Sequence, residues 1–413
     1  MKILLLTHYF WPEIGAPQVI HLEWIKRLSA RGHDITVVTG FPHYPDGVIA
    51  EGYRGKIFMR EEHAGARIFR TATYATPNAG FAKRLLNHLS LTASSLTAFP
   101  FVGDVDVIIT EYPPLFTALA GIAFAKLRGI PHVLNAGDLW VEFALEMGAL
   151  KKGPASSAAL ALSTAIEKTS ARVLVTSEGC IDKLAQAGIA RERVAYLPNS
   201  VDVEHFSPNP ERRAHVREQW GWSDKVVCLY HGTHGLAQGL VQVVDAAALL
   251  REDLRIQFVL IGSGAEKSIV QERVRALGLT NVEMHGPQPF SAMPGIVDAC
   301  DIGLVPLKDI PMFRITLPSK MFEFMAMEKP VALAVDGDAR VICEGGGAGL
   351  FAPPEHPAQY AEAIRKLARD KELRESMGRV GRKIAVERYS RDRYAEDLEN
   401  ILQETIAQSQ QRN

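Results

Sequence analysis

Cysteine is scarce in this sequence. The 413 residues include four, which are widely and irregularly spaced: Cys180, Cys228, Cys300 and Cys343. A structural zinc site needs closely spaced pairs of ligands, and a disulfide-stabilised domain needs a denser framework. Both classes are excluded, and we expect four reduced, mostly buried thiols in a protein of the cytoplasm.

A long apolar run is also missing. No stretch holds the roughly 18 apolar residues that are needed to span a bilayer. The apolar start at residues 3–6 is too short for a signal peptide, and no small-residue cleavage site follows it. It predicts a buried first strand instead, and we expect a protein that is not integral to a membrane.

Neither sign of charge dominates the composition. Lys and Arg number 46 and Asp and Glu number 47, which gives a formal net charge of −1. Such a chain has no overall field that attracts nucleic acid or an anionic membrane, so we expect no nucleic-acid partner and at most a local attraction to lipid. With 47% apolar and 23% charged residues, the composition is typical of a globular protein large enough for two α/β domains.

Strand and helix patterns alternate through both halves of the chain. A strand at 2–7, an amphipathic helix at 18–31 and a strand at 35–39 form one βαβ unit. Further strands are expected at 105–110, 132–135, 173–176, 226–230, 256–261, 282–285, 302–306 and 331–335. Further helices are expected at 240–251, 268–277, 320–327, 357–369 and 391–404. This alternation predicts the α/β class, with two doubly wound, Rossmann-like domains.

The boundary between these domains is marked by proline. Three prolines punctuate the chain near 199–210, where we place the linker. We therefore expect an N-terminal domain at 1–200 and a C-terminal domain at 201–389.

A glycine-rich segment at 231–239 joins an expected strand to a helix that begins near Leu240. Backbone N–H groups around Gly232 and Gly235 can approach a phosphate, aided by the N-terminus of the helix. The same glycines also suit an ordinary tight turn that requires their backbone freedom. From this segment alone, the two interpretations are equally open.

The run Pro318-Ser319-Lys320 offers a second candidate for anion binding. Ser319 is expected as the N-cap of a helix. Lys320 would then lie in the first turn, where the helix dipole favours acidic side chains, so a bound anion would explain its presence. A solvent-exposed lysine is the alternative. Glu323 follows one turn later on the same face.

Two segments about a hundred residues apart resemble the nucleotide-sugar half of glycosyltransferase family 4. The first, 197–208, contains Leu-Pro-Asn-Ser-Val-Asp, and the second, 317–331, contains Leu-Pro-Ser-Lys-Met-Phe-Glu-Phe-Met-Ala and then Lys-Pro-Val. Within this family, the chain resembles most the subgroup of colanic acid and O-antigen fucosamine transferases. The resemblance rests on the Pro-Ser-Lys run and on a Gln-Gly-Leu run at 238–240. The resemblance implies the GT-B fold, in which two Rossmann-like domains face across a cleft and a terminal helix, here 390–413, crosses back to the first domain.

The resemblance also implies a donor site. Lys320 would bind the donor pyrophosphate and act in catalysis, and Glu323 would hold the ribose, because a carboxylate accepts two hydrogen bonds at once. The other donor-binding residues that it implies are Gly15, Gly232, Gly235, Gln238 and Ser319.

Three positions depart from the family pattern. The usual arginine and lysine of the glycine segment are replaced by Thr233 and Gln238, which leaves Lys320 as the substitute cation. The first of the family's two paired glutamates is replaced by Ile315. This loss indicates either a different donor sugar, such as a deoxy sugar, or lost activity.

Two candidate positions lie in the first half. Asp138 begins an Asp-Leu-Trp run that the subgroup shares, and it is a candidate catalytic residue at the end of a strand. An N-cap of the following helix is the alternative role. Gly15 lies in the first βα loop, which in GT-B enzymes reaches toward the donor phosphates; an ordinary turn glycine is the alternative.

The stretch 81–102 could be a membrane-facing helix. Its apolar stripe is Phe81, Leu85, Leu89 and Leu96, beside the basic Lys83, Arg84 and His88. Such a helix can rest on a lipid surface. A core-facing helix with solvated charges is the alternative.

The resemblance implies a retaining glycosyltransferase that needs neither a metal nor a cofactor. Its donor would be a nucleotide sugar, UDP-linked, and its acceptor a lipid-linked saccharide, such as a polyprenyl diphosphate sugar, at the inner face of a bacterial membrane. The alternatives are a nucleotide-sugar epimerase and a catalytically silent nucleotide-sugar-binding protein. A dehydrogenase is disfavoured because the first βα loop lacks Gly-x-Gly-x-x-Gly.

Overall fold

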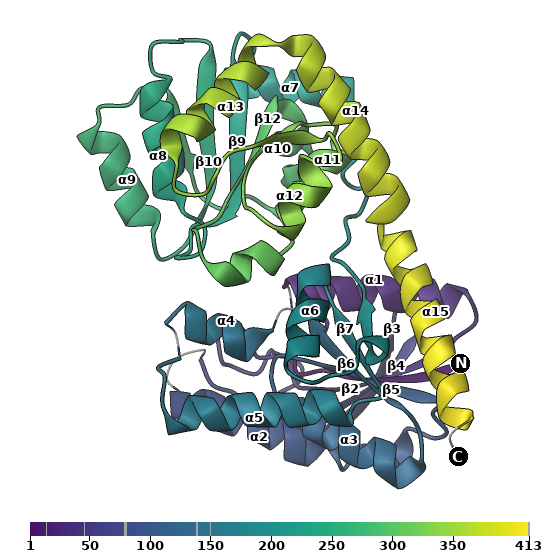
Figure 1. Ribbon diagram of the computed structural model, residues 1–413. Coiled ribbons are helices and arrows are strands. Elements are labelled where there is room, and N and C mark those ends of the chain that lie inside the picture. Colours follow the sequence, from purple (N-terminus) through teal and green to yellow (C-terminus); the bar gives the residue numbers. More distant parts are fainter. Residues whose placement is uncertain (14, 45, 78–80, 138, 149, 412–413) are drawn as a thin grey trace. The chain divides into compact units, whose positions relative to one another are not determined.

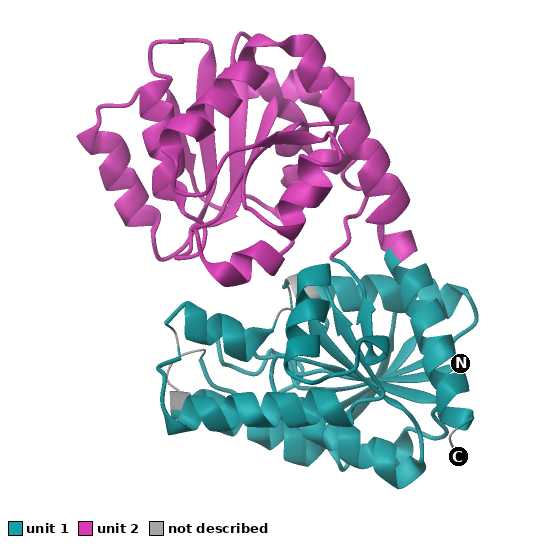
Figure 2. Ribbon diagram, in the orientation of Figure 1, with its two compact units in different colours: residues 1–198, 394–413 teal, residues 199–393 magenta. Residues whose placement is uncertain are grey.

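The computed structural model describes residues 1–13, 15–44, 46–77, 81–137, 139–148 and 150–411. The chain forms two compact units (Figure 2). Unit 1 contains Met1–Pro198 together with Tyr394–Asn413, and unit 2 contains Asn199–Arg393. Each unit has a sheet of its own with helices on both faces (Figure 1), so the predicted α/β class with two Rossmann-like domains is confirmed.

Unit 1 is built on an eight-stranded sheet of order β3-β4-β2-β1-β5-β6-β7-β8. Its strands are β1 Lys2–Leu6, β2 Asp34–Gly40, β3 Phe58–His63, β4 Ala66–Thr71, β5 Val107–Glu111, β6 His132–Gly137, β7 Arg172–Val175 and β8 Val194–Tyr196. Its helices are α1 Ala16–Ala30, α2 Phe81–Ser95, α3 Thr117–Arg128, α4 Trp140–Glu146, α5 Pro154–Thr169, α6 Glu178–Gln186 and, from Tyr394 onward, α15 Arg391–Gln410.

The first strand shows why the chain folds this way. Alternate residues of β1 enter different apolar clusters: Ile3 and Leu5 pack with α1 and α15, whereas Leu4 and Leu6 pack with the segment around Phe99 and with α3. A parallel strand that is covered on both faces must be apolar throughout, and this explains the unbroken run at the start of the sequence. In unit 1 the residues Tyr394, Ala395, Leu398 and Leu402 of α15 belong to the first of these clusters.

The hairpin of β3 and β4 was missed by sequence reasoning. The two strands pair antiparallel, and β4 continues the sheet parallel to β2. The turn between them uses Ala64 and Gly65, both with positive φ. In the structure β3 alternates exposed and partly buried residues, but its sequence Phe-Met-Arg-Glu-Glu-His does not alternate apolar with polar residues, so the local signal was weak.

Unit 2 is built on a six-stranded parallel sheet of order β11-β10-β9-β12-β13-β14. Its strands are β9 Val226–Thr233, β10 Ile256–Ser263, β11 Val282–His285, β12 Ile302–Pro306, β13 Val331–Ala334 and β14 Gly349–Phe351. Its helices are α7 Pro210–Gln219, α8 Leu240–Leu249, α9 Lys267–Ala276, α10 Met293–Ala299, α11 Ser319–Ala326, α12 Asp338–Cys343, α13 Pro357–Arg369 and α14 Lys371–Arg388.

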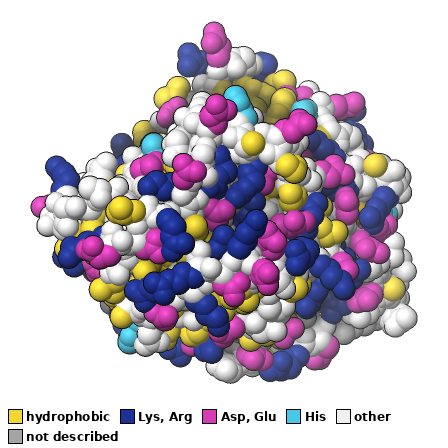
Figure 3. Space-filling view, turned by 90° about the horizontal axis from the view of Figure 1, so that it is seen from above, with side chains coloured by type: hydrophobic (Ala, Val, Ile, Leu, Met, Phe, Trp, Pro, Cys, Tyr) yellow, Lys and Arg dark blue, Asp and Glu magenta, His cyan; other side chains and the backbone are white. Residues whose placement is uncertain are grey.

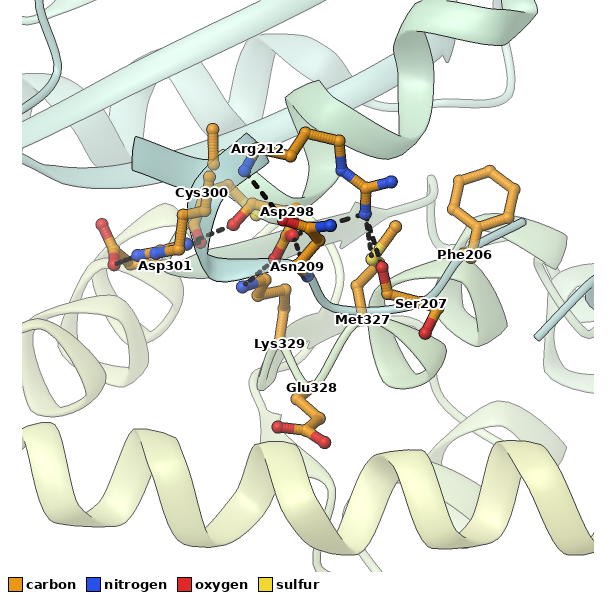
Figure 4. Close-up of polar contacts among 12 residues, drawn as sticks. Phe206, Ser207, Asn209, Arg212, Asp298, Cys300, Asp301, Met327, Glu328 and Lys329 are labelled. Carbon is orange, nitrogen blue, oxygen red and sulfur yellow. Dashed lines mark hydrogen bonds and ion pairs between the residues drawn. The ribbon is translucent and has the colours of Figure 1, made fainter. Parts of the chain in front are cut away.

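A buried ion network joins α7 to the rest of unit 2 (Figure 4). Asp298 is 1% exposed and accepts hydrogen bonds from the backbone N–H of Asn209 at 2.7 Å and from Lys329 Nζ at 3.1 Å, while Arg212 Nη2 lies 3.4 Å away. A buried carboxylate needs such partners, because an unpaired charge in the interior is very costly. The network therefore fixes Asn209 and the first turn of α7 to the rest of unit 2.

A pocket of about 510 Å³ lies beside this network. Its wall includes Lys329 and Asp298, which are paired with each other, and it lies near the start of β12, at the amino edge of the sheet. Rossmann-like folds bind ligands at the opposite, carboxyl edge. The surface at the top of Figure 1 carries basic side chains with acidic ones set among them (Figure 3), so this side of the molecule offers no uniform patch for an anion.

Candidate functional site

The carboxyl ends of β9 and β10 approach each other closely in unit 2. The sequence predicted that β9 ends at Tyr230, but the strand continues to Thr233, so the turn itself is shorter than the predicted glycine segment. Gly232 has φ +117°, and a Cβ added at Gly262, whose φ is +146°, would lie 1.8 Å from the Gly232 carbonyl oxygen. These glycines are therefore required by the backbone itself.

Lys320 lies over this strand end. Its Nζ donates a hydrogen bond to Gln238 Oε1 at 3.3 Å and stands 4.8 Å from the ring centre of Tyr230. Its Cε is 3.6 Å from the position that a Cβ on Gly232 would take. The structure thus brings together three predicted donor-site residues, Gly232, Gln238 and Lys320, from two separate segments.

The environment of Lys320 disfavours its charge. Burial lowers the pKa of this amine to about 8, although nearby Glu323 raises it. The ring of Tyr230 is fixed beneath it, because its hydroxyl donates to the Thr233 carbonyl oxygen at 2.6 Å. A cation that is partly desolvated and carries neutral partners is suited to receive an anion.

Ser319 does not cap the helix, and this prediction was wrong. The N-cap of α11 is Pro318, whose carbonyl oxygen accepts from the Met321 N–H at 3.0 Å, and Ser319 is the first helical residue and exposed. Pro318 has the extended backbone that an N-cap requires, so the helix begins one residue earlier than the side-chain chemistry suggested.

Glu323 lies one turn after Lys320 on α11. Burial raises the pKa of its carboxyl to about 7, although Lys320 and Arg391 lower it. Its Oε2 is 3.4 Å from Nε2 of His231 on β9. Burial, followed by the charge of Lys320, lowers the pKa of His231 to about 3, so this imidazole is neutral at physiological pH. Sequence reasoning missed His231, because it treated the residue as the first position of the glycine segment.

A pocket of about 340 Å³ adjoins these residues. It is lined by His231, Gly232, Thr233, Ile261, Gly262, Ser263, Pro287, Gln288, Phe290 and Met293. The ring of Phe290 stacks on the ring of His205, with 4.6 Å between ring centres. An apolar pocket with a few polar groups and shifted pKa values beside it is the usual form of a small-molecule site.

The remaining predicted site residues lie elsewhere. Gly235 is in the turn after β9, where its carbonyl oxygen accepts from the Gln238 N–H at 3.1 Å. Gly15 belongs to unit 1, as the extended N-cap of α1. Asp138 lies outside the described residues, so its predicted catalytic role stays a prediction.

A buried polar network follows β1 in unit 1, and sequence reasoning did not foresee it. His8 Nε2 donates to Asn87 Oδ1 at 2.6 Å, and Asn87 Nδ2 donates to His43 Nε2 at 2.9 Å and to the Tyr74 carbonyl oxygen at 2.7 Å. Burial above all lowers the pKa of His8 to about 3, so the ring is neutral. The network fixes the loop after β1 to the body of α2.

Helix α2 differs from its predicted form. The helix ends at Ser95, earlier than the predicted stretch 81–102; Leu86, Leu89 and, after its end, Leu96 are exposed, whereas Leu85 is partly buried. Burial, with help from Arg84, lowers the pKa of His88 to about 4, so His88 contributes no positive charge at neutral pH. Lys83 and Arg84 are the exposed cations of this helix. No helix in the described part of the chain is both long and apolar enough to cross a bilayer.

Comparisons with known proteins identify the family of the chain. The family model described as "Glycosyl transferases group 1" matches residues 213–384, and the model described as "Glycosyl transferase 4-like domain" matches residues 15–200. The chain is similar to the "Putative colanic acid biosynthesis glycosyl transferase WcaI" of Escherichia coli (strain K12), with 29% identity over 379 residues, 89% of this chain and 92% of that protein.

Two solved structures share the fold of nearly the whole chain. Anabaena Alr3699/HepE in complex with UDP has a TM-score of 0.73 and 18% identity, covering 98% of this chain and 100% of that one. Sucrose-phosphate synthase from Thermosynechococcus elongatus has a TM-score of 0.76 and 17% identity, with the same coverage of both chains.

Proposed function

Because the chain belongs to glycosyltransferase family 4, with the GT-B fold, we propose that it transfers a sugar from a nucleoside diphosphate sugar to an acceptor hydroxyl, with retention of configuration and without a metal ion. The observation that carries the proposal is the convergence of Lys320, Gln238 and Glu323 at the carboxyl end of β9. Parallel α/β sheets bind nucleotides at this edge.

Each part of a nucleotide has a matching group in unit 2. The pyrophosphate would lie against Lys320 and the backbone of Gly232, the ribose hydroxyls would donate to Glu323, and the base would enter the pocket beside Phe290. The base is uracil in our proposal, since the related HepE structure contains UDP. Ser319 and Gly235 complete the proposed donor-binding set of unit 2, and the proposed donor role of Gly15 in unit 1 rests on the family resemblance alone.

In the proposed reaction, the bond between C1 of the donor sugar and the phosphate oxygen breaks, and the diphosphate leaves with both electrons. The acceptor hydroxyl attacks C1 from the same face and passes its proton to the departing phosphate oxygen. Lys320 stabilises the negative charge that develops on this oxygen, and such stabilisation is the largest contribution that a site of this kind can make. By resemblance, Asp138 would act at the acceptor side.

The acceptor we propose is a lipid-linked saccharide of bacterial surface polysaccharide biosynthesis. The name of the relative WcaI supports this process for the chain. A polyprenyl diphosphate sugar would be met at the cytoplasmic face of the membrane, and the exposed leucines of α2 would face the lipid.

A panel of nucleotide sugars tests the proposal. A bound donor at a hundredfold excess over its dissociation constant stabilises the protein by about 2.7 kcal/mol, which a thermal shift assay detects. The stabilising donor is then incubated with polyprenyl diphosphate saccharides, and the transferred sugar is identified by mass spectrometry. Release of nucleotide without an acceptor would support an epimerase instead, and tight binding without turnover would support a silent nucleotide-sugar-binding protein.

The pH dependence of binding follows from Lys320. Its amine has a pKa of about 8 in the free protein, and a bound diphosphate favours the protonated form. Above pH 8 the affinity for UDP should therefore fall by roughly tenfold per pH unit, until the pKa of the complex is reached. Isothermal titration calorimetry from pH 7 to pH 9 measures this fall in affinity. Lys320→Arg should flatten it, because arginine stays charged; an equally steep fall in that variant would refute the assignment.

Membrane binding should depend on α2. Leu86 and Leu89 are 55% and 40% exposed, and Lys83 and Arg84 stand beside them. Each cation near an anionic surface contributes about 1 kcal/mol, which is screened by salt, and the leucines supply the rest. The protein should sediment with phosphatidylglycerol vesicles at low salt, and the double change Leu86→Ser and Leu89→Ser should reduce this while UDP binding is kept.

The matched control is the double change Leu249→Ser and Leu254→Ser, which removes two exposed leucines from unit 2. Its sedimentation should equal that of the natural protein. Equal losses of sedimentation in both double variants would mean that lipid binding is nonspecific and that α2 has no special role.

A further inference from the structure

The carboxyl group of Glu323 lies against an imidazole that comes from another element. Nε2 of His231, the sixth residue of β9, is 3.4 Å from Oε2 of Glu323. The two side chains are 10% and 24% exposed. They come from segments about ninety residues apart in the sequence, so their meeting is a product of the fold.

The ring of His231 has little freedom to turn away. Phe324 packs edge-on against it, with 5.0 Å between ring centres and an angle of 67° between planes. Nε2 is buried and has no hydrogen-bond partner at the present separation. Native proteins seldom leave such an atom unpaired except where function requires it. A small approach of the Glu323 carboxylate would pair it.

We propose that His231 is a positioning residue, which donates Nε2–H to Oε2 of Glu323 and thereby holds this carboxylate in place for the ribose hydroxyls of the donor. The proposal rests on the proposed function and adds the group that makes Glu323 selective for ribose. With Oε2 held by one N–H, both carboxylate oxygens still have lone pairs for the two vicinal hydroxyls.

The charges around Glu323 explain why an uncharged hydrogen-bond donor is needed beside its carboxyl group. Three groups face the carboxyl: His231 from β9, Lys320 from its own helix and Arg391 from the start of α15. Burial outweighs the two cations and raises the pKa of Glu323 to about 7, so the free protein holds this carboxyl partly protonated at neutral pH. A protonated carboxyl is a weaker acceptor for the two ribose hydroxyls, because it has lost its negative charge and one of its oxygens carries the proton. An N–H from His231 favours the ionised form, and the neutral ring adds no charge beside Lys320.

The test compares UDP with 2′-deoxy-UDP between pH 6 and pH 8 by calorimetry. The ratio of the two dissociation constants isolates the ribose contact, because ionisation of the phosphate is common to both ligands. In the natural protein we expect a preference for UDP of about ten- to a hundredfold at pH 8, which declines as the pH falls through 7 and Glu323 gains its proton. In His231→Phe the preference at pH 7 should fall by about tenfold, and its decline should begin at a higher pH.

Two further variants separate positioning from packing. His231→Gln should restore the preference, because its amide N–H can take the place of Nε2–H. His231→Asn should not restore the preference, since its shorter amide reaches only the position of Nδ1. If His231→Phe fails to fold, His231→Asn takes its place as the variant without the N–H. The affinity for 2′-deoxy-UDP should stay within about twofold in all three variants.

An unchanged preference and pH profile in His231→Phe would show that the ring only packs against Phe324 and would overturn the proposal. UDP bound by the natural protein without a preference for ribose would also overturn it, while leaving nucleotide binding intact. If the natural protein bound neither ligand, the proposed function would fail and this role of His231 with it.

Discussion

Replacement of Lys320 by alanine should weaken the binding of UDP by about ten- to 150-fold, because a hydrogen bond to a charged group contributes about 1.5–3 kcal/mol. The positions that usually hold arginine and lysine near the glycine turn carry Thr233 and Gln238, so neither of them can replace the lost charge. Gln238 already accepts from Lys320, so the variant also loses the contact that joins α11 to this turn. Calorimetry with UDP and with uridine measures the effect.

Uridine is the internal control in this experiment, since it lacks the phosphates that Lys320 is proposed to bind. Its affinity should change by no more than about twofold. The matched variant is Lys371→Ala, which removes an exposed lysine on α14 of the same unit and should leave UDP binding unchanged. Equal losses for UDP and uridine in Lys320→Ala would reject the pyrophosphate role and would point to a disturbed helix.

The change Glu323→Gln should lower the affinity for UDP by roughly ten- to a hundredfold, for the same energetic reason. Glutamine keeps the shape of the side chain but cannot accept with both terminal atoms, so one of the two ribose hydroxyls loses a charged partner. The fold should survive, because burial already disfavours the ionised carboxyl and raises its pKa to about 7. The dissociation constants for UDP and 2′-deoxy-UDP, measured at pH 8, show the change.

In this variant the preference for UDP over 2′-deoxy-UDP should largely disappear. Glu272→Gln on α9 is the control, since it makes the same change at an exposed position of unit 2. A natural protein that binds the 2′-deoxy ligand as tightly as UDP would contradict the assignment of Glu323 before any variant is made.

Much of the fold could be predicted from local patterns. The strands β1, β2, β9, β10, β12 and β13 were foreseen to within a few residues, because parallel strands that are covered on both faces are short and continuously apolar. The hairpin of β3 and β4 was missed, since an edge strand carries charged residues and has a weak pattern. The end of β9 was placed three residues too early, because Gly232 and Thr233 look like a turn but pair in register with Gly262 and Ser263 of β10.

Some residues of the candidate site could likewise be predicted from the sequence, and others could not. Lys320 and Glu323 could be placed on one face of one helix from their spacing alone. Ser319 was misassigned as the N-cap, since the capping preference of serine did not outweigh the extended backbone of Pro318. His231 could not be found from the sequence, because a single histidine next to a glycine has no pattern and its meaning depends on a carboxyl about ninety residues away.

The sequence by itself determined the class of this protein: two α/β units, a glycine-rich strand end and a helix that begins with a lysine and a glutamate one turn apart. These are local properties, set by hydrophobic period, backbone freedom and helical spacing. The tertiary structure alone decided which groups meet. It set Lys320 over Tyr230 and Gln238, brought His231 within 3.4 Å of Glu323, and buried these charges enough to move the pKa of Lys320 to about 8 and that of Glu323 to about 7. Desolvation and long-range contact depend on every element packed around a residue, and no short segment of sequence contains that information.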